Sequence, residues 1–225
     1  MSLLDTCALI WFVLAWAGYA LFHDRLTSRG RPNLVVVMEQ WRFRWADAMA
    51  RREVRIIDSQ LINGLVQKDA FFASTSILII AGLVALFGSG DRARDLATVL
   101  PIMAPVTPIT WSLKVGLLAA AFVYAFFKFG WAIRQHSYSA VVVASIPEPP
   151  PTGEDLVAKE RARRAARLGS LGAKHFNDGV RAYYFAVAGL GWFIHPIVFI
   201  AATTWVTAVL YRRDFLSRAV RILSD

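Results

Sequence analysis

The sequence predicts an all-α integral membrane protein: a four-helix bundle with cytoplasmic helical extensions. Of its 225 residues 56% are hydrophobic, including 15 Phe and 8 Trp, which is high for a soluble chain. The apolar residues also fall into four long runs, each about long enough to cross a hydrocarbon core roughly 30 Å thick. We interpret residues 1–225 as a single membrane domain. The predicted spans are residues 3–22, 70–88, 113–133 and 183–210.

Basic residues set the expected orientation of the spans. The loop of residues 23–69 contains nine Arg or Lys, and the loop of residues 134–182 contains eight. Because Lys and Arg retard the translocation of short loops, both loops are expected in the cytoplasm and the N-terminus outside. The formal net charge is +9, and the basic residues that give rise to it lie beside the spans. The expected partners are therefore anionic lipid headgroups, not nucleic acid.

The C-terminal tail conflicts with this orientation, because an even number of spans places it outside although it is basic. Its arginines are Arg212, Arg213, Arg218 and Arg221. Its apolar residues at helical spacing are Phe215, Leu216, Ala219, Val220 and Leu223. We predict four spans, because the seventeen basic residues of the two loops outnumber the four arginines of the tail. The tail is then an amphipathic helix in the outer interface. The alternative is a fourth span that turns back at Pro196 and returns the tail to the cytoplasm.

The first cytoplasmic loop contains an apolar stripe at helical spacing. Val54, Ile57, Leu61 and Leu65 recur at intervals of three and four residues, which predicts an amphipathic helix running directly into the second span. This stripe needs a partner, either the second cytoplasmic loop or a neighbouring copy. We therefore expect the stripe to be buried and the protein to be a homo-oligomer.

Prolines shape the other two connections. In the second cytoplasmic loop residues 147–151 predict a stiff polyproline-like stretch, followed by a capping box of Thr152 and Asp155 and a helix over residues 154–168. The outer loop contains prolines among apolar residues, so we expect it to pack over the spans or to form a re-entrant segment. These prolines are Pro101, Pro105 and Pro108.

Lys128 is the ionisable residue deepest within the third span, and it shares a helical face with Tyr124 and Gln135. Its ammonium either reaches the cytoplasmic headgroups or meets a buried partner. Ser74, Thr75 and Ser76 lie at nearly the same depth in the second span, and together with Lys128 they form a candidate anion-coordinating vestibule. The alternative is that these hydroxyls bond their own helix backbone.

His195 precedes Pro196 in the fourth span. Proline cannot donate to the carbonyl of Trp192, so a kink and an unpaired acceptor are expected beside a histidine near the middle of the membrane. A titratable group there is a candidate for a transport path, although a neutral imidazole bonded within the bundle needs no function.

The residues contain no complete catalytic or metal-binding pattern. The four histidines have no partner at ligand spacing on one helix, and no nucleophile is paired with a base. We therefore expect no enzymatic activity, no cofactor and no metal.

Three segments resemble family 599 of the domains of unknown function, a family of multi-pass membrane proteins. They are FFASTSILIIAGLVALFG from Phe71, VYAFFKFGWAIRQHSYS from Val123, and FNDGVRAYYFAVAGLGWFIHP from Phe176 through VLYRRDF. The resemblance implies a four-span protein of the bacterial inner membrane and assigns no activity. The residues that it carries over are Lys128, Arg134, Gln135, Tyr138, Arg181, Tyr183 and His195.

These observations predict an oligomeric channel or transporter for a small ion or solute. The alternative is a non-transporting scaffold that organises lipid or a partner complex. A conduction path needs polar faces turned inward on more than one span, whereas a scaffold needs only packed interfaces.

Overall fold

The computed structural model describes residues 1–28, 33–89, 107–150, 153 and 155–224. Within these residues all regular structure is helical and no strand occurs, which confirms the all-α prediction. The helices are α1 (Leu3–Ser28), α2 (Leu34–Ala50), α3 (Ile56–Gly88), α5 (Pro108–Ala144), α6 (Leu156–Ile194), α7 (Pro196–Phe215) and α8 (Arg218–Ser224).

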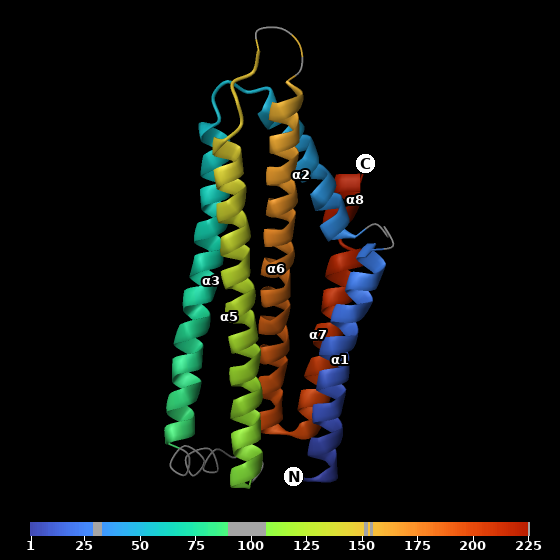
Figure 1. Cartoon of the computed structure of the whole chain (residues 1–225). Coiled ribbons are helices and arrows are strands. Elements are labelled where there is room, and N and C mark those ends of the chain that lie inside the picture. The colour runs from blue at the N-terminus through green and yellow to red at the C-terminus, as the bar shows by residue number, and fades with distance from the viewer. Residues whose placement is uncertain (29–32, 90–106, 151–152, 154, 225) are drawn as a thin grey trace.

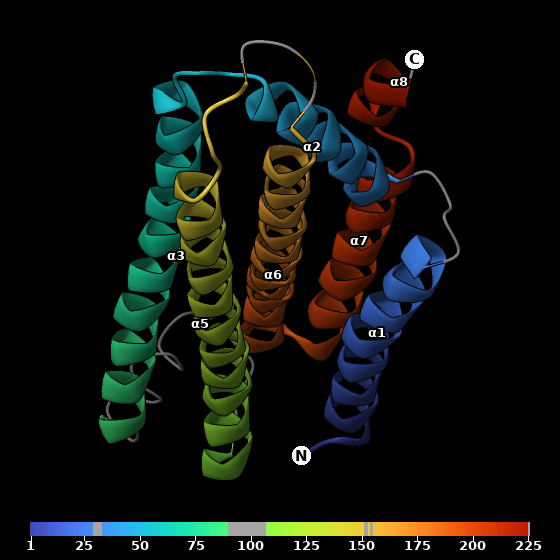
Figure 2. The same cartoon turned by 45° about the horizontal axis from the view of Figure 1, so that its top comes forward.

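The long helices lie side by side (Figure 1). α3, α5 and α6 form one row, and α1 and α7 form a pair that packs against α6 through α7. α2 packs across the upper part of α6, with α8 beside it (Figures 1 and 2). We call this upper end the basic end, and the opposite end, where the N-terminus lies, the turn end.

Three helices are long and apolar enough to cross a membrane. Their apolar stretches are Leu3–Thr27, Ile56–Gly88 and Pro108–Ala144, and they contain the first three predicted spans. α3 and α5 have 33 and 37 residues. At about 1.5 Å per residue both exceed the thickness of a hydrocarbon core, so they continue beyond it. The expected unbroken helix from the first loop into the second span is confirmed by α3.

The prediction of one fourth span over residues 183–210 is wrong. α6 ends at Ile194, and His195 adopts an extended backbone with φ −161° and ψ 144°. α7 then begins at Pro196 and returns toward the basic end (Figure 1). The physical reason is that proline has no N–H to continue the helix and disfavours helical geometry in the residue before it. Gly191 permits the tight reversal, because a Cβ there would lie 3.3 Å from backbone atoms of Phe199.

This reversal also removes the conflict over the C-terminal tail. The tail forms α8 at the basic end, opposite the N-terminus, and not at the turn end, as four straight spans would require (Figure 1). Val220 of α8 is buried there, and Trp41 of α2 donates its indole N–H to the carbonyl of Leu223 at 3.0 Å. Among the residues that the structure describes, the strongly basic stretches therefore lie toward one end of the bundle.

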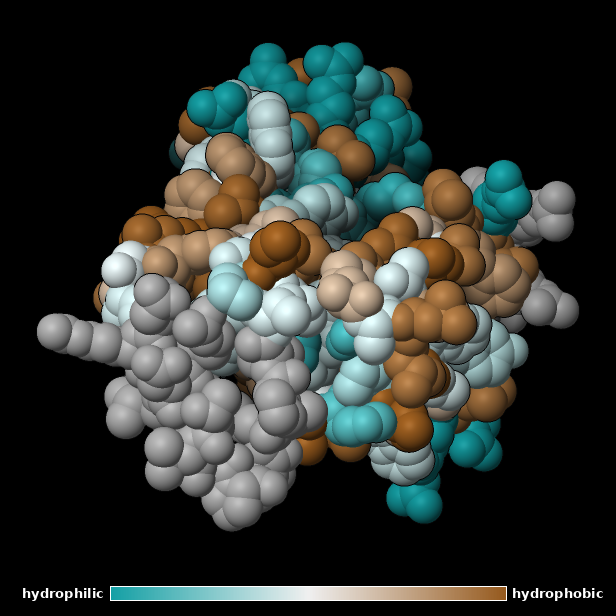
Figure 3. Space-filling view, turned by 90° about the horizontal axis from the view of Figure 1, so that it is seen from below, coloured by the Kyte–Doolittle hydropathy of each residue, from teal (hydrophilic) through white to brown (hydrophobic). Residues whose placement is uncertain are grey.

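From the turn end, apolar residues run across the middle of the molecule and hydrophilic residues gather mainly at one edge (Figure 3).

Side chains that cap the helices fix where several of them begin. Asn33 caps α2 by accepting from the N–H of Val36 at 3.0 Å, and Thr107 caps α5 ahead of Pro108. The predicted capping box is replaced by a single residue: Asp155 itself caps α6 by accepting from the N–H groups of Val157 and Ala158. Thr152, Pro101 and Pro105 lie outside the described residues.

α6 is longer than the predicted loop helix, because it continues from the basic end without a break to the turn. At the basic end its buried residues are small, including Ala158, Ala162 and Ala165. They pack against Ala46 and Met49 of α2. Small side chains on both helices let the backbones approach closely, which positions α2 over the bundle.

Most of the predicted stripe is exposed in the single chain: Val54, Ile57 and Leu61 are 67%, 71% and 55% exposed, and Leu65 is half-buried. The second cytoplasmic loop therefore does not cover the stripe, and its burial against a neighbouring copy stays a prediction. α3 instead turns Asp58 inward, where its carboxylate accepts from Trp45 Nε1 at 2.6 Å and Arg52 Nη1 at 2.5 Å. These two hydrogen bonds hold Asp58 inside the protein and so determine the rotation of α3 about its own axis. This rotation leaves the apolar stripe on the outer face.

Candidate functional site

Lys128 has a buried partner and does not belong to the predicted vestibule. Its ammonium donates to Asp178 Oδ2 of α6 at 2.8 Å and lies 5.4 Å from the ring centre of Tyr124. The side chains of Lys128 and Asp178 are only 23% and 14% exposed. Of the two alternatives left open by the sequence, the structure therefore favours a specific partner.

Of the three hydroxyls of α3, that of Ser76 contacts α6, at a different place from Lys128. Thr75 donates to the carbonyl of its own helix at Phe71, and Ser76 donates to Phe72 and bonds the hydroxyl of Tyr183 at 2.9 Å. Tyr183 and Asp178 are five residues apart, which is about 140° around a helix. Ser76 and Lys128 therefore contact different faces of α6, and Ser74 is exposed, so the predicted vestibule of three hydroxyls and one ammonium is wrong.

The other predicted residues occupy separate places. Tyr124 packs edge-on against Trp16 of α1, with ring centres 5.6 Å apart. Gln135 is half-buried near the basic end of α5. His195 is exposed at the turn, where its Nδ1 accepts from the N–H of Ile197 at 3.2 Å. The placement of His195 near the middle of the membrane is therefore wrong, because the chain reverses at this residue.

A chain of buried charged and polar groups continues from Asp178 into the junction of α1, α6 and α7. Arg181, 4% exposed, lies 3.6 Å from Asp178, and its Nη2 lies 3.4 Å from Nδ1 of His23. Because a guanidinium only donates, Nδ1 of His23 accepts and the ring proton resides on Nε2. That nitrogen faces Asp214 of α7 at 3.6 Å.

The chain ends at Tyr19, whose hydroxyl donates to Asp214 Oδ2 at 2.8 Å. Tyr19, His23 and Asp214 are all less than 7% exposed. In the other direction the chain reaches the surface, because Asp24 lies 3.8 Å from His23 and pairs with Lys174 at 3.4 Å. Asp24 and Lys174 are about half exposed. We call Lys128, Asp178, Arg181, His23, Asp214 and Tyr19 the inner charge chain.

A second buried polar contact lies near the turn end. Lys114, 2% exposed, donates to the carbonyl oxygen of Trp192 at 2.7 Å. The indole N–H of Trp192 donates to Asp5 Oδ1 of α1 at 2.9 Å. The acceptor that the sequence predicted to be unpaired at Trp192 is thus satisfied by a lysine.

Aromatic side chains fill the space between these two polar layers. Phe12 and Trp16 of α1 pack on Phe185 of α6, with ring centres 5.8 and 5.7 Å apart. Phe12 also packs on Phe199 of α7 at 5.1 Å. We call these four residues the aromatic seam. It joins the α1–α7 pair to α6 and separates the inner charge chain from Lys114.

Sequence reasoning missed most of the inner charge chain. Asp178 and Arg181 lie in the predicted loop of residues 134–182, His23 lies in the predicted loop of residues 23–69, and Asp214 lies in the predicted tail. One local signal was present: Asp178 and Arg181 are three residues apart, the spacing at which opposite charges meet on a helix.

A buried pair, Asp69 and His136, lies toward the basic end. His136 Nδ1 and Asp69 Oδ2 are 2.7 Å apart, and the residues are 2% and 0% exposed. Nε2 of His136 has no hydrogen-bond partner within the described part of the chain. Gly172 makes room for this ring, because a Cβ there would lie 2.6 Å from Nε2.

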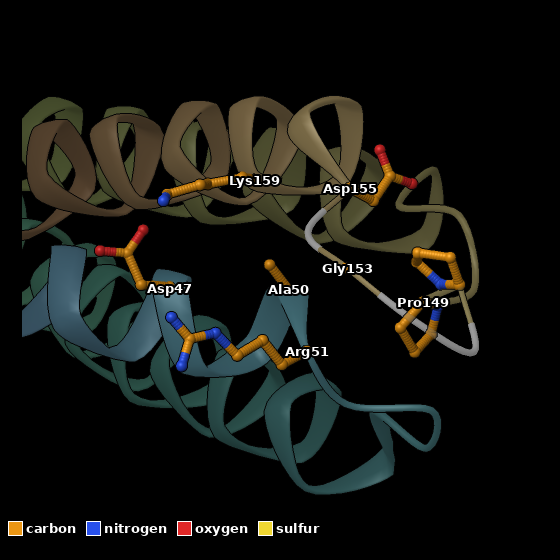
Figure 4. A pocket seen from close by; sticks show the side chains of 8 residues that line it. Asp47, Ala50, Arg51, Pro149, Gly153, Asp155 and Lys159 are labelled. Atoms are coloured by element: carbon orange, nitrogen blue, oxygen red, sulfur yellow. The ribbon is translucent and has the colours of Figure 1, made fainter.

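A polar pocket with a volume of about 450 Å³ lies between α2 and the start of α6 (Figure 4). Charges of both signs line it, among them Asp47, Arg51 and Lys159. Its carboxylates already have partners: Asp47 accepts from Arg163 at 3.1 Å, and Asp155 caps α6. The pocket therefore offers no site of a single charge sign.

The fold and the site define the class of protein: an all-helical chain with three helices able to cross a membrane and charged pairs buried between helices. The chain belongs to the family described as "Protein of unknown function, DUF599", which it matches over residues 7–219. The resemblance noted in the sequence is thereby confirmed. No curated protein and no solved structure matches the chain.

Proposed function

We propose that the protein resides in a bacterial inner membrane with its basic end in the cytoplasm and its N-terminus outside. α1, α3, α5, the lower part of α6, and α7 would then cross the membrane, the last two as a hairpin. This arrangement puts the four arginines of the tail on the same side as the seventeen basic residues of the two loops. The rule that basic segments stay inside supports it.

We further propose that the protein transports a small ion or solute across that membrane. The observation that supports this function is the inner charge chain, which links four helices at the junction of α1–α7 with α5–α6. Charged side chains within a membrane are costly, and in transmembrane helices they mark ion pathways and proton relays. Here the inner charge chain runs from Lys128 to the buried Tyr19, and the half-exposed Asp24 connects its His23 to the surface.

The two polar layers suggest how such a protein would work. Asp5 and Tyr19 are fourteen residues apart on α1, about 21 Å at the helical rise. The aromatic seam fills the space between the levels of Asp5 and Tyr19. In a transporter this would be a closed conformation, because no path connects the two polar layers within the described residues. Transport would require the α1–α7 pair to move against α5 and α6, exchanging contacts at the seam. During this movement α6 and α7 would stay connected through the turn at His195.

Self-association is part of the proposal. Val54, just before α3, and Ile57 and Leu61 in the first turns of α3 form an apolar stripe near the basic end and are more than half exposed in the single chain. Burying such a stripe against a second copy would remove it from water or from the headgroup region.

The scaffold is the second candidate function, and the aromatic seam favours it. Within the described residues the space between the α1–α7 pair and α6 is filled by side chains, which is what a permanently packed bundle would show. In that case the inner charge chain would serve only to fix how the helices dock.

Ion flux in proteoliposomes tests the proposal. Protons, followed with an internal pH dye under a potassium diffusion potential, and chloride are the two probes. The wild-type protein should pass at least one of them faster than protein-free liposomes, and Asp214→Asn should reduce that flux at least tenfold. The matched control is Asp47→Asn, which removes a surface carboxylate paired with Arg163 and should leave the flux unchanged. Wild-type liposomes that pass neither probe would reject transport and favour the scaffold.

A further inference from the structure

A second cavity, of about 200 Å³, lies between α2, α3 and α6 near the basic end. Its wall has two chemically different parts. Leu34, Met38 and Leu65 provide apolar surface, whereas Arg42 and Lys68 provide charged nitrogen donors. These residues belong neither to the inner charge chain nor to the aromatic seam.

Two cations face this cavity without a direct carboxylate bond. The charge of Arg42 repels that of Lys68, whose ammonium lies 3.8 Å from the ring centre of Phe176. Burial lowers the pKa of the Arg42 guanidinium, and the nearby Glu39 partly offsets this effect. Acids are close to both cations, Glu39 to Arg42 and Asp69 to Lys68, but neither accepts a hydrogen bond from them within the described residues. A pair of like charges held close together is favourable when an anion lies between them.

His136 also lines the cavity and is 2% exposed. Its Nε2 lies against Gly172, where an added Cβ would be 2.6 Å away, and Asp69 holds the other ring nitrogen at 2.7 Å. The imidazole is therefore a fixed part of the cavity wall, and the charged donors are Arg42 and Lys68. The first turn of α2, at Leu34, also lines the cavity and adds the positive end of a 17-residue helix.

We propose that this cavity binds a phosphate group through Arg42 and Lys68. A phosphate has several acceptor oxygens, which matches a guanidinium from α2 and an ammonium from α3. The apolar part of the wall fits the first carbons of an acyl chain, as in an anionic phospholipid. A free phosphate would use the donors alone. The proposal does not depend on transport, so the flux measurement and the binding measurement can fail separately.

Ligand-induced thermal stabilisation of the detergent-solubilised protein tests the site. The probes are dioctanoyl phosphatidylglycerol, inorganic phosphate, and dioctanoylglycerol, which lacks the phosphate. Phosphatidylglycerol should raise the unfolding temperature and dioctanoylglycerol should not. A response to phosphatidylglycerol alone identifies a lipid headgroup, and an equal response to inorganic phosphate identifies a free phosphate.

The variants locate the binding. Arg42→Gln should weaken the apparent affinity roughly tenfold, the effect of losing one charge-assisted contact, and Arg42→Lys should retain most of it. Arg44→Gln is the matched control, because Arg44 lies on the same helix but is exposed and stacks on Trp41 at 4.5 Å. If Arg42→Gln does not fold, Lys68→Gln makes the same test from α3. Equal affinities in wild type, Arg42→Gln and Lys68→Gln would overturn the proposal, as would equal stabilisation by dioctanoylglycerol.

Discussion

The ammonium of Lys114 donates to the carbonyl oxygen of Trp192 at 2.7 Å, across the interface of α5 and α6. The carbonyl needs an outside donor because residue 196 is a proline and the chain reverses one residue before it. A cation at the C-terminal end of α6 also opposes the negative end of the helix dipole. One lysine thus satisfies the end of α6 and holds the α6–α7 turn against α5.

Replacing Lys114 with Met should therefore destabilise the fold. The variant keeps much of the stem but leaves a buried carbonyl without its donor, at a cost of about 1–3 kcal/mol. The measurement is the unfolding temperature in detergent. Lys174→Met is the control, since Lys174 is half exposed and pairs with Asp24 at the surface. An unchanged unfolding temperature for Lys114→Met would show that the contact does not stabilise the turn.

The first three spans could be predicted because hydropathy over about twenty residues depends only on composition. The fourth could not, because an apolar run interrupted by Pro196 is compatible both with a kinked helix and with a hairpin. The choice depends on what Trp192 and Gly191 contact, and those contacts come from α5 and α7. Counting basic residues in loops favoured the wrong alternative.

Only part of the candidate site could be predicted, because the other part depends on how the helices pack. Lys128 was identified because a charge inside an apolar span is conspicuous. Its partner Asp178 was not, because α6 continues from a basic segment into the membrane region and its polar residues look like loop residues. Depth along a helix is readable from the sequence, but rotation about the helix axis depends on packing, which is why Ser76 meets Tyr183 and not Lys128.

The coupling between Lys128 and Asp178 should be measurable by a double-mutant cycle. Both side chains are partly buried and 2.8 Å apart, so we expect an interaction free energy of about 1 kcal/mol. Lys128→Met, Asp178→Asn and the double variant would be compared by chemical unfolding in detergent. Strictly additive effects would indicate that the ion pair makes no net contribution.

Gly172 should not tolerate a side chain. A Cβ would lie 2.6–2.9 Å from three ring atoms of His136, which is held in place by Asp69. Gly172→Ala is expected to lower the free energy of unfolding by about 1–3 kcal/mol. Gly64→Ala serves as the opposite case, because a Cβ there meets nothing within 4 Å and alanine should stabilise α3 by about 0.5–1 kcal/mol. If both variants were equally stable, the close packing at His136 would be refuted.

The exposed stripe on α3 predicts a specific effect on association. Leu61→Asp introduces a charge where a second copy would pack, so the particle mass of the purified protein should fall toward that of one chain. Gln67→Asp, at an exposed polar position of the same helix, should leave the mass unchanged. Light scattering of the detergent-solubilised variants measures this. An identical mass for wild type and Leu61→Asp would remove the support for an oligomer formed through this stripe.

The α6–α7 hairpin is the central claim, since it places every basic segment on one side and creates the junction that contains the inner charge chain. Cysteine accessibility in intact cells tests it most directly, starting from a variant in which Cys7, exposed on α1, is replaced by alanine. An impermeant thiol reagent applied outside should label cysteines introduced at Ser2 and Ser89, which lie at the turn end, but not one introduced at Ser217, between α7 and α8. Labelling of the Ser217 cysteine together with those at Ser2 and Ser89 would restore four straight spans and contradict the hairpin.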